Sequence, residues 1–287
     1  KAYRDAAKVF TKLCIKDKDF SFSHTRTRGI ADTLASSMGV GTIYWDTFKE
    51  KMEALGYEAT WLESIDITSD FIGLDYMTFL LKNHKGECIG LARRWMRWNK
   101  KDSESARNAG QHYMPKYKNT SGTKNPTYHK SQFLYGLYRA IEAKTSKEDL
   151  DEGFANVIAM VQAGPTHVFA LFGTAVTKQQ VQLLRNLGFT NINITLDADD
   201  AGIANMDKHL SAFKSIQGIR TTITVLEFDE EVAQEDRDPC CWIQMHGLAE
   251  YFEIKRKTAF DWQLEKLIFK KVAYPDIAKQ MIDYILA

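Results

Sequence analysis

Three acidic side chains near the middle of the chain have the spacing expected of a divalent-cation site. Asp197 and Asp199 follow the alternating segment 191–196, and carboxylates at i and i+2 of an extended chain project to the same side. Glu152 offers a third carboxylate upstream. Oxygen ligands of this kind suit Mg²⁺, which can stabilise in-line attack on a phosphorus centre. An acidic loop after a strand is also common without any metal.

The segments around these acids alternate between strand and helix patterns. Thr177 is placed to cap a helix that Gly188 ends. Strands are expected over 167–173, 191–197 and 220–228, and helices over 177–188 and 202–213. This βαβαβ order predicts a parallel sheet with Asp197 and Asp199 at the carboxyl end of a strand, where open α/β sheets place their ligands.

The remainder of the chain is expected to be helical at both ends. Residues 71–83 and 84–96 are two apolar runs that predict a hairpin with its turn near Asn83 and Gly86. Residues 99–125 lack apolar periodicity, and a loop is expected over 119–126. Helices are predicted over 6–14, 29–38, 45–55 and 59–65, and again over 242–252, 258–271 and 275–286. The fold class is therefore mixed α/β.

The composition is that of a globular protein with more than one compact unit. The chain has 287 residues, of which 44% are hydrophobic and 26% charged. It contains no apolar run long enough to span a bilayer, and we expect no membrane partner. Its four cysteines include no C-x-x-C pair, so a structural zinc site is not expected and a reducing cytoplasm fits best.

Charge is unevenly distributed along the chain, although the formal net charge is only +1. Residues 82–130 contain twelve Lys or Arg and three acids, whereas residues 147–238 contain seven Lys or Arg and fifteen acids. The basic stretch predicts binding of a polyanion by counterion release. Trp95 and Trp98 within it could stack on unpaired bases, but packing into the core is the interpretation we favour for these two. A solvated surface whose charges never converge is the alternative for the whole pattern.

Short motifs along the chain resemble two related families. Glu152-Gly153, LFGTAVTKQQVQLL and LDADDAGIANM occur in the order of the three landmarks of the TOPRIM domain, which primases, type IA and II topoisomerases and some nucleases share. The segments IGLARRWM and PKYKNTSGTKNPTYHKSQFLYGLYRA resemble the stretch that leads into this domain in bacterial DnaG-type primases. SHTRTRGIADTLASSMGVG and RDPCCWIQMHG resemble flanking parts of the same family.

The resemblance to DnaG-type primases implies a fold, a site and an activity. It implies an N-terminal α/β subdomain over 1–143, a central TOPRIM βαβαβ sheet over 144–237 and a C-terminal helical subdomain over 238–287. The implied catalytic residues are Glu152, Asp197 and Asp199. These residues would hold Mg²⁺ or Mn²⁺ with Asp238 nearby, and a basic ridge for nucleic acid or nucleotide would be formed by Arg28, Arg94, Lys116 and Lys130.

The implied activity is template-directed synthesis of short RNA primers on single-stranded DNA. Its substrates would be ribonucleoside triphosphates, its location the cytoplasm within bacterial or phage replication machinery, and its further partner a replicative helicase reached through regions outside this chain.

Several positions differ from the family pattern. The segment 146–151 before Glu152 has a single apolar residue, and Asn156 stands where the family has an acid. Cys240 replaces the last aspartate of an Asp-Pro-Asp turn. Two other hypotheses therefore stay open: a TOPRIM nuclease or topoisomerase-like protein that cleaves phosphodiesters, and a catalytically degenerate protein that binds single-stranded DNA.

Overall fold

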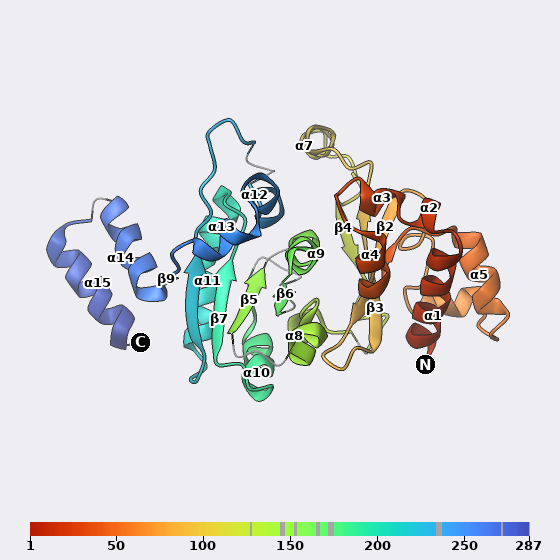
Figure 1. The fold of residues 1–287 in the computed structure, drawn as a ribbon, viewed down its shortest axis with the longest axis horizontal. Coiled ribbons are helices and arrows are strands. Elements are labelled where there is room, and N and C mark those ends of the chain that lie inside the picture. Colours follow the sequence, from red (N-terminus) through yellow and green to blue (C-terminus); the bar gives the residue numbers. More distant parts are fainter. Residues whose placement is uncertain are drawn as a thin grey trace. The chain divides into compact units, whose positions relative to one another are not determined.

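The chain forms two compact units, each with its own β-sheet. The computed structural model describes residues 1–126, 128–143, 147–151, 154–164, 167–171, 175–233, 237–270 and 272–286. The units are Lys1–Tyr138 and Arg139–Ala287, and Figure 1 shows their elements. The mixed α/β fold class is confirmed, while the finer division at 143 and 237 stays a prediction. Within the described residues, no helix combines the length and the apolar character needed to cross a membrane.

The first unit packs helices against an antiparallel sheet of order β1-β2-β3-β4. Its strands are β1 (Val40–Gly41), β2 (Tyr76–Lys82), β3 (Cys88–Trp95) and β4 (Tyr117–Asn119). Its helices are α1 (Ala2–Lys16), α2 (Lys18–Ser21), α3 (Ser23–Arg26), α4 (Asp32–Met38), α5 (Trp45–Glu53), α6 (Ala59–Ser64), α7 (Lys100–Asn108) and the 3₁₀ helix η1 (Lys130–Gln132). Phe10, Phe48 and Phe79 are among its fully buried side chains, so helices and sheet share one apolar core.

The predicted hairpin is confirmed. β2 and β3 pair antiparallel from Tyr76 opposite Trp95 onward. Asn83 and Gly86 close the turn, since the Gly86 amide donates to the Asn83 carbonyl at 2.9 Å and Gly86 has φ +77°. Only glycine adopts this conformation without steric cost. The hairpin directs Arg94 and Trp95 to the end of β3 that lies opposite this turn.

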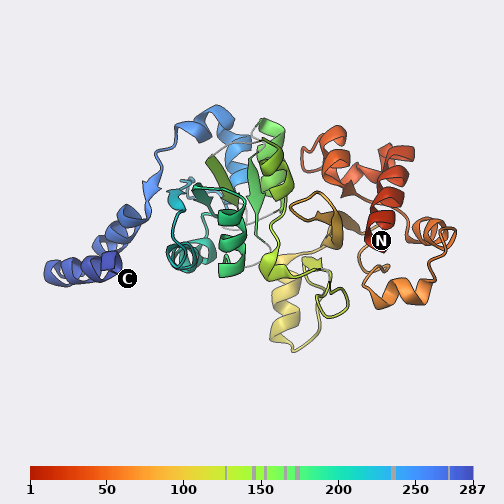
Figure 2. The ribbon, with the colours of Figure 1, turned by 90° about the horizontal axis from the view of Figure 1, so that it is seen from below.

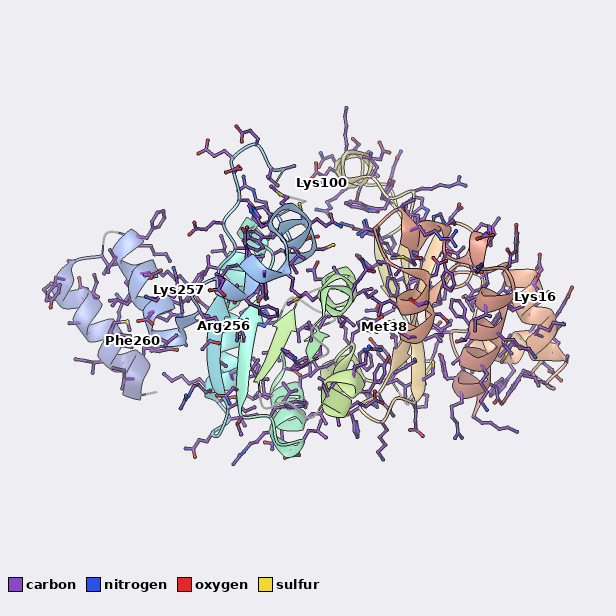
Figure 3. The ribbon with its side chains drawn as sticks, in the orientation of Figure 1. Lys16, Met38, Lys100, Arg256, Lys257 and Phe260 are labelled. Atoms are coloured by element: carbon purple, nitrogen blue, oxygen red, sulfur yellow. The ribbon has the colours of Figure 1, made fainter. Side chains whose placement is uncertain are left out.

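The loop expected over 119–126 is confirmed from Thr120 onward, but the residues before it contain two elements that the sequence did not predict. These are α7 and β4, and Figure 3 shows the side chains of α7, which begins at Lys100, extending outward. None of the α7 side chains is buried, so the helix leaves no apolar periodicity in the sequence. Its start is fixed by Asn99, whose side chain accepts a hydrogen bond from the Asp102 amide.

The second unit contains a five-stranded sheet of order β6-β5-β7-β8-β9. The strands are β5 (Lys147–Asp151), β6 (Val168–Ala170), β7 (Asn191–Thr195), β8 (Arg220–Thr224) and β9 (Lys257–Thr258). The helices are α8 (Leu137–Ala143), which begins at the boundary, α9 (Phe154–Ala163), α10 (Lys178–Asn186), α11 (Asp200–Lys214), α12 (Pro239–His246), α13 (Leu248–Glu253), α14 (Ala259–Phe269) and α15 (Tyr274–Leu286). The first four strands are parallel, as predicted, and β9 is antiparallel.

Helices cover both faces of this sheet. α12 packs against α9, and α10 packs against α11. Figure 2 shows α9, α12 and α13 on one side of the strands and α10 and α11 on the other. This arrangement follows from right-handed crossovers, because the chain passes from β5 to β6 in one direction and from β6 through β7 to β8 in the opposite direction.

β5 is a central strand although its sequence is almost entirely polar. Leu150 is the only apolar residue of 147–151, yet β5 pairs with β6 on one side and β7 on the other. Pairing on both sides satisfies the backbone groups of the strand. The strand is therefore defined by its neighbours rather than by its own hydrophobic pattern.

Capping residues set the helix boundaries in this unit. Thr177 and Gln180 form a reciprocal capping box at the start of α10, which confirms the cap predicted at Thr177.

The expectation of one helix over 242–252 is wrong, because Gly247, with φ +89° and ψ 161°, separates α12 from α13. Such a backbone conformation cannot continue a helix.

The Thr177 cap gives a direct test of the fold. We expect Thr177→Ala to lower the free energy of unfolding by about 1 kcal/mol, because the Gln180 amide loses its acceptor. The measurement is urea denaturation followed by circular dichroism. Gln179→Ala, an exposed change in the same helix, is the control; equal stability of the two variants would contradict the assigned cap.

Candidate metal centre and nucleic-acid interface

The loop that carries Asp197 and Asp199 begins at one edge of the second sheet. Asp151 pairs with Thr195, and Thr195 pairs with Thr224, so β5, β7 and β8 end at the same level. Glu152 directly follows β5 in the sequence but lies outside the described residues. Asp197 follows the end of β7 by two residues. The parallel register thus places the strand that precedes Glu152 beside the strand that precedes Asp197.

Asp197 is oriented by an amide from α9. Asn156 is 3% exposed, and its Nδ2 donates to Asp197 Oδ1 at 3.3 Å. A neutral donor at this position satisfies one carboxylate oxygen without adding charge. The sequence marked Asn156 as a departure from an acidic pattern, and the structure shows it in direct contact with a predicted metal ligand.

Asp199 caps α11. Its Oδ1 accepts from the Gly202 amide at 2.7 Å, and Oδ2 has no hydrogen-bond partner within the described part of the chain. The positive end of the helix dipole stabilises a carboxylate at this position. One oxygen of Asp199 is therefore engaged in the fold while the other is available to a cation.

Gly202 permits a close approach of helix and strand end. A Cβ atom at this position would lie 2.1 Å from the Asp197 carbonyl oxygen, far inside van der Waals contact. Any larger residue would push the first turn of α11 away from the loop that carries Asp197 and Asp199. Gly202 is thus required by the geometry of the acidic loop.

Asp238 belongs to a loop that is hydrogen-bonded to the acidic segment. The Ala198 amide donates to the Arg237 carbonyl at 2.7 Å. Asp238 itself caps α12, since its Oδ1 accepts from the Cys241 amide at 2.7 Å. The placement of Asp238 near Asp197 and Asp199 was implied by resemblance alone, and this backbone contact supports it.

The donors present suit a hard divalent cation. Asp197, Asp199 and Asp238 offer only carboxylate oxygens, which match the preference of Mg²⁺ and Mn²⁺. Within the ranges that the structure describes, no three His, Cys, Asp or Glu residues form a cluster able to hold a metal. The complete ligand set with Glu152 therefore stays a prediction.

The predicted basic residues fall into separate local groups of the first unit. Arg94 is half-buried on β3; its Nη1 donates to the Tyr117 hydroxyl at 2.8 Å, and its guanidinium lies 5.3 Å from the centre of that ring. Lys116 immediately precedes β4, and its Nζ lies 5.0 Å from the centre of the Trp98 ring. Arg28 lies between α3 and α4, and Lys130 begins η1.

Strand alternation places Arg94 and Lys116 on different faces of the sheet. Arg94 is opposite Tyr117 in the β3–β4 register, so the residue before Tyr117 points to the other side. Trp95 and Trp98 are half-buried rather than in the core, and Trp95 contacts the Tyr113 ring at 5.4 Å. The favoured interpretation of core packing is therefore wrong for these two tryptophans.

One cation in the basic stretch has a structural role. Arg93 is buried and donates to the carbonyls of Asp70 and Pro115 at 3.0 and 2.9 Å. Burial lowers the pKa of this guanidinium, which nevertheless stays charged at neutral pH. The local charge of the sequence therefore overstates the number of cations available to a ligand.

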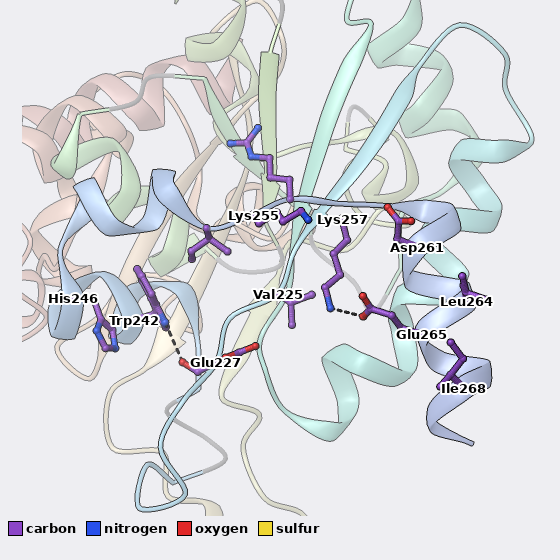
Figure 4. Close-up of a pocket in the computed structure, with 12 residues that line it drawn as sticks. Val225, Glu227, Trp242, His246, Lys255, Lys257, Asp261, Leu264, Glu265 and Ile268 are labelled. Carbon is purple, nitrogen blue, oxygen red and sulfur yellow. Dashed lines mark hydrogen bonds and ion pairs between the residues drawn. The ribbon is translucent and has the colours of Figure 1, made fainter. Parts of the chain in front are cut away.

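A cavity in the second unit was not predicted. It has a volume of about 610 Å³ and lies beyond β8, between α12 and α14. Figure 4 shows Lys257 paired with Glu265 on one side and Trp242 bonded to the Glu227 carbonyl on the other. Its lining mixes both charges with Val225, Leu264 and other apolar side chains.

This chain is similar to Toprim-like domains and to DNA primases. Residues 150–238 match the Toprim-like family. A DNA primase of Synechococcus elongatus is 32% identical over 161 residues, which are 54% of this chain and 22% of that protein. The RNA polymerase domain of Mycobacterium tuberculosis primase DnaG superposes with a TM-score of 0.73 at 22% identity, covering 93% of this chain and 86% of that one.

The chain has the fold of a DnaG-type primase catalytic core. A further solved structure with this fold, a DnaG primase catalytic domain bound to single-stranded DNA, matches with a TM-score of 0.64 at 20% identity and covers 92% of this chain and 84% of that one. The predicted resemblance to DnaG-type primases is confirmed. The chain spans less than a quarter of the length of its cyanobacterial relative, so the activity and partners of a whole primase are proposals here.

The close approach of α11 to the acidic loop at Gly202 can be tested by substitution. We expect Gly202→Ala to lower the free energy of unfolding by about 2–4 kcal/mol, because its Cβ would overlap the Asp197 carbonyl. The same displacement should weaken Mn²⁺ binding, measured by electron paramagnetic resonance (EPR). Ile203→Ala, at a neighbouring exposed position, is the control. A Gly202→Ala protein as stable as this control would rule out the close approach.

Proposed function

We propose that this chain is the catalytic core of a primase, which joins ribonucleoside triphosphates on a single-stranded DNA template. The observation that supports this most strongly is the arrangement of Asp197 and Asp199 at the carboxyl edge of a Toprim-like sheet, each with one oxygen already held by the fold. Toprim domains also occur in topoisomerases and nucleases. The match to a primase fold over nearly the whole chain favours primer synthesis over the reactions of those enzymes.

The reaction is a nucleotidyl transfer. The 3′-hydroxyl oxygen of one nucleotide attacks the α-phosphorus of the next, the new phosphodiester bond forms, and pyrophosphate leaves with the bonding electrons. Glu152, which follows β5 in the sequence, would complete the metal site or accept the hydroxyl proton. Mg²⁺ or Mn²⁺ bound by Asp197, Asp199 and Glu152, with Asp238 nearby, would neutralise charge on the triphosphate.

The side chains of the first unit would bind phosphates and bases. Arg94 presents a planar guanidinium that can hold a phosphate through two hydrogen bonds, whereas Lys116 and Lys130 act as point charges. Arg28 adds a fourth cation. Trp98, half-buried beneath Lys116, offers a partly exposed indole on which an unpaired base could stack.

Such an enzyme would act in the cytoplasm, in bacterial or phage replication. It would meet a replicative helicase through regions outside this chain.

The metal role is tested by removing charge without removing hydrogen-bond acceptors. Asp199→Asn keeps an N-cap and Asp197→Asn keeps an acceptor for Asn156, so both variants should fold. We expect each to reduce primer synthesis on single-stranded DNA with Mg²⁺ or Mn²⁺ at least about 100-fold, because the ligand charge is lost. Radiolabelled ribonucleotide incorporation is the measurement.

Asp276→Asn, which neutralises an exposed acid on α15, is the matched control. Parent-like synthesis by both Asp197→Asn and Asp199→Asn would overturn the proposal. Release of nucleotides from DNA without incorporation would instead favour the cleavage hypothesis.

The basic residues are tested by the salt dependence of binding to single-stranded DNA. Arg94→Ala and Lys116→Ala should each reduce the slope of log affinity against log salt by about 0.7, since each releases one phosphate contact. Trp98→Ala should weaken binding about tenfold with an unchanged slope, because stacking displaces no counterions. Fluorescence anisotropy measures both effects. Lys12→Ala, on the exposed side of α1, is the control; slopes that match it would contradict the assignment.

A further inference from the structure

Buried polar side chains form a connected network on one face of the second sheet. Asn193, Thr195 and Thr224 are each at most 3% exposed. Asn193 Nδ2 donates to Thr224 Oγ1 at 2.9 Å and to Thr195 Oγ1 at 3.3 Å. The oxygen of the same Asn193 amide, Oδ1, accepts a hydrogen bond from Thr222 Oγ1 at 3.1 Å. The network therefore runs across β8 and along β7 toward the carboxyl edge of the sheet.

Tyr251 from α13 connects to this network at the end of β7. Its hydroxyl lies 2.8 Å from Thr195 Oγ1, with either group able to donate. Tyr251 is 2% exposed and is the only buried residue of α13. A buried hydroxyl requires such a partner, since leaving it unsatisfied costs about 1–3 kcal/mol. The contact joins residues 56 positions apart in the sequence.

The ring of Tyr251 is fixed by its neighbours. Trp242 meets it edge to face, with 6.2 Å between ring centres. The Trp242 indole in turn donates to the Glu227 carbonyl at 3.1 Å, which attaches α12 to the segment after β8 (Figure 4). Packing and hydrogen bonding together direct the Tyr251 hydroxyl at Thr195.

The network ends next to the candidate metal ligand. Asn193, Thr195 and Asp197 follow one another at i, i+2 and i+4, so an extended chain directs them to the same face. Asn156 contacts Asp197 from α9 on that face, and α12 packs against α9. Thr195 is the last residue of β7 before the acidic loop, and its position limits where Asp197 can lie.

Stability alone does not require polar groups at these positions. A valine and a phenylalanine of nearly the same shapes would fill the space of Thr195 and Tyr251 with no hydroxyl to satisfy. Hydrogen bonds add directionality, because each fixes a donor and an acceptor in one relative geometry. The network is best explained by a need to fix the end of β7.

We propose that Tyr251 is a positioning residue for the metal centre, acting through Thr195 to fix the end of β7 and with it the Asp197 carboxylate. This inference rests on the proposed function in taking Asp197 as a metal ligand. Tyr251 itself touches neither metal nor substrate. Outer partners of this kind set the orientation of metal ligands and influence metal affinity.

The test measures Mn²⁺ affinity directly, by EPR on the full chain. Tyr251→Phe should weaken Mn²⁺ binding about three- to tenfold, because Thr195 loses its hydrogen bond to α13 and keeps only the one to Asn193, so the end of β7 is held less tightly. Thr195→Val should give the same loss, whereas Thr195→Ser, which keeps the hydroxyl, should retain the affinity of the parent. The double variant Tyr251→Phe/Thr195→Val should lose no more Mn²⁺ affinity than either single variant, as expected when both remove the same interaction.

Val181→Ala separates positioning from general stability. Val181 is fully buried on α10, and its truncation should lower the melting temperature without changing Mn²⁺ affinity. α10 covers the opposite face of the sheet from α13, the helix that carries Tyr251. A loss of Mn²⁺ affinity in Val181→Ala equal to that in Tyr251→Phe would show a merely structural effect and overturn the inference.

The remaining outcomes distinguish this inference from the proposed function. If Asp197→Asn loses Mn²⁺ binding while Tyr251→Phe and Thr195→Val bind like the parent, the positioning role is wrong and the metal site stands. If Asp197→Asn also binds Mn²⁺ like the parent, the metal role of Asp197 fails and the positioning inference fails with it.

Discussion

The parallel register of β5, β7 and β8 is the constraint on which the candidate site depends. Asp151, Thr195 and Thr224 lie side by side, so the chain leaves the sheet at one level after each strand. A slip of one residue would turn the side chains of a strand to the opposite face. Asp197 would then point away from Asn156, and the acidic loop would lose its orientation. Backbone hydrogen bonding thus determines where the strands end and where the acidic loop begins.

Negative charge at a sheet edge is electrostatically unfavourable, and the fold stabilises each of the three described carboxylates separately. Asn156 donates to Asp197, the first turn of α11 donates to Asp199, and the first turn of α12 donates to Asp238. Each interaction stabilises negative charge through a donor or a helix dipole. A divalent cation would neutralise what remains, which is why an acidic edge of this construction suits phosphate chemistry. The arrangement also explains Gly202, since a side chain there would separate helix from loop.

Much of this fold could be predicted from local patterns, and the failures have physical causes. The cap at Thr177 and the alternation of β7 are encoded within a few residues, so these elements were found. α7 was missed because it buries no side chain, and the break at Gly247 lies inside an apolar run. β5 is polar in sequence and is defined by its two neighbours. Contacts such as Tyr251 with Thr195 arise only from tertiary packing, and no spacing in the sequence indicates them.

The proposed primase chemistry requires that Asp197 and Asp199 jointly bind a catalytic divalent cation. Anomalous diffraction at the manganese edge, from crystals of the parent chain soaked in saturating Mn²⁺, measures this directly. We expect an anomalous peak within coordination distance of both carboxylates, on the side of the sheet edge where β5 ends. Electron density for both aspartates with no manganese peak between them would contradict it.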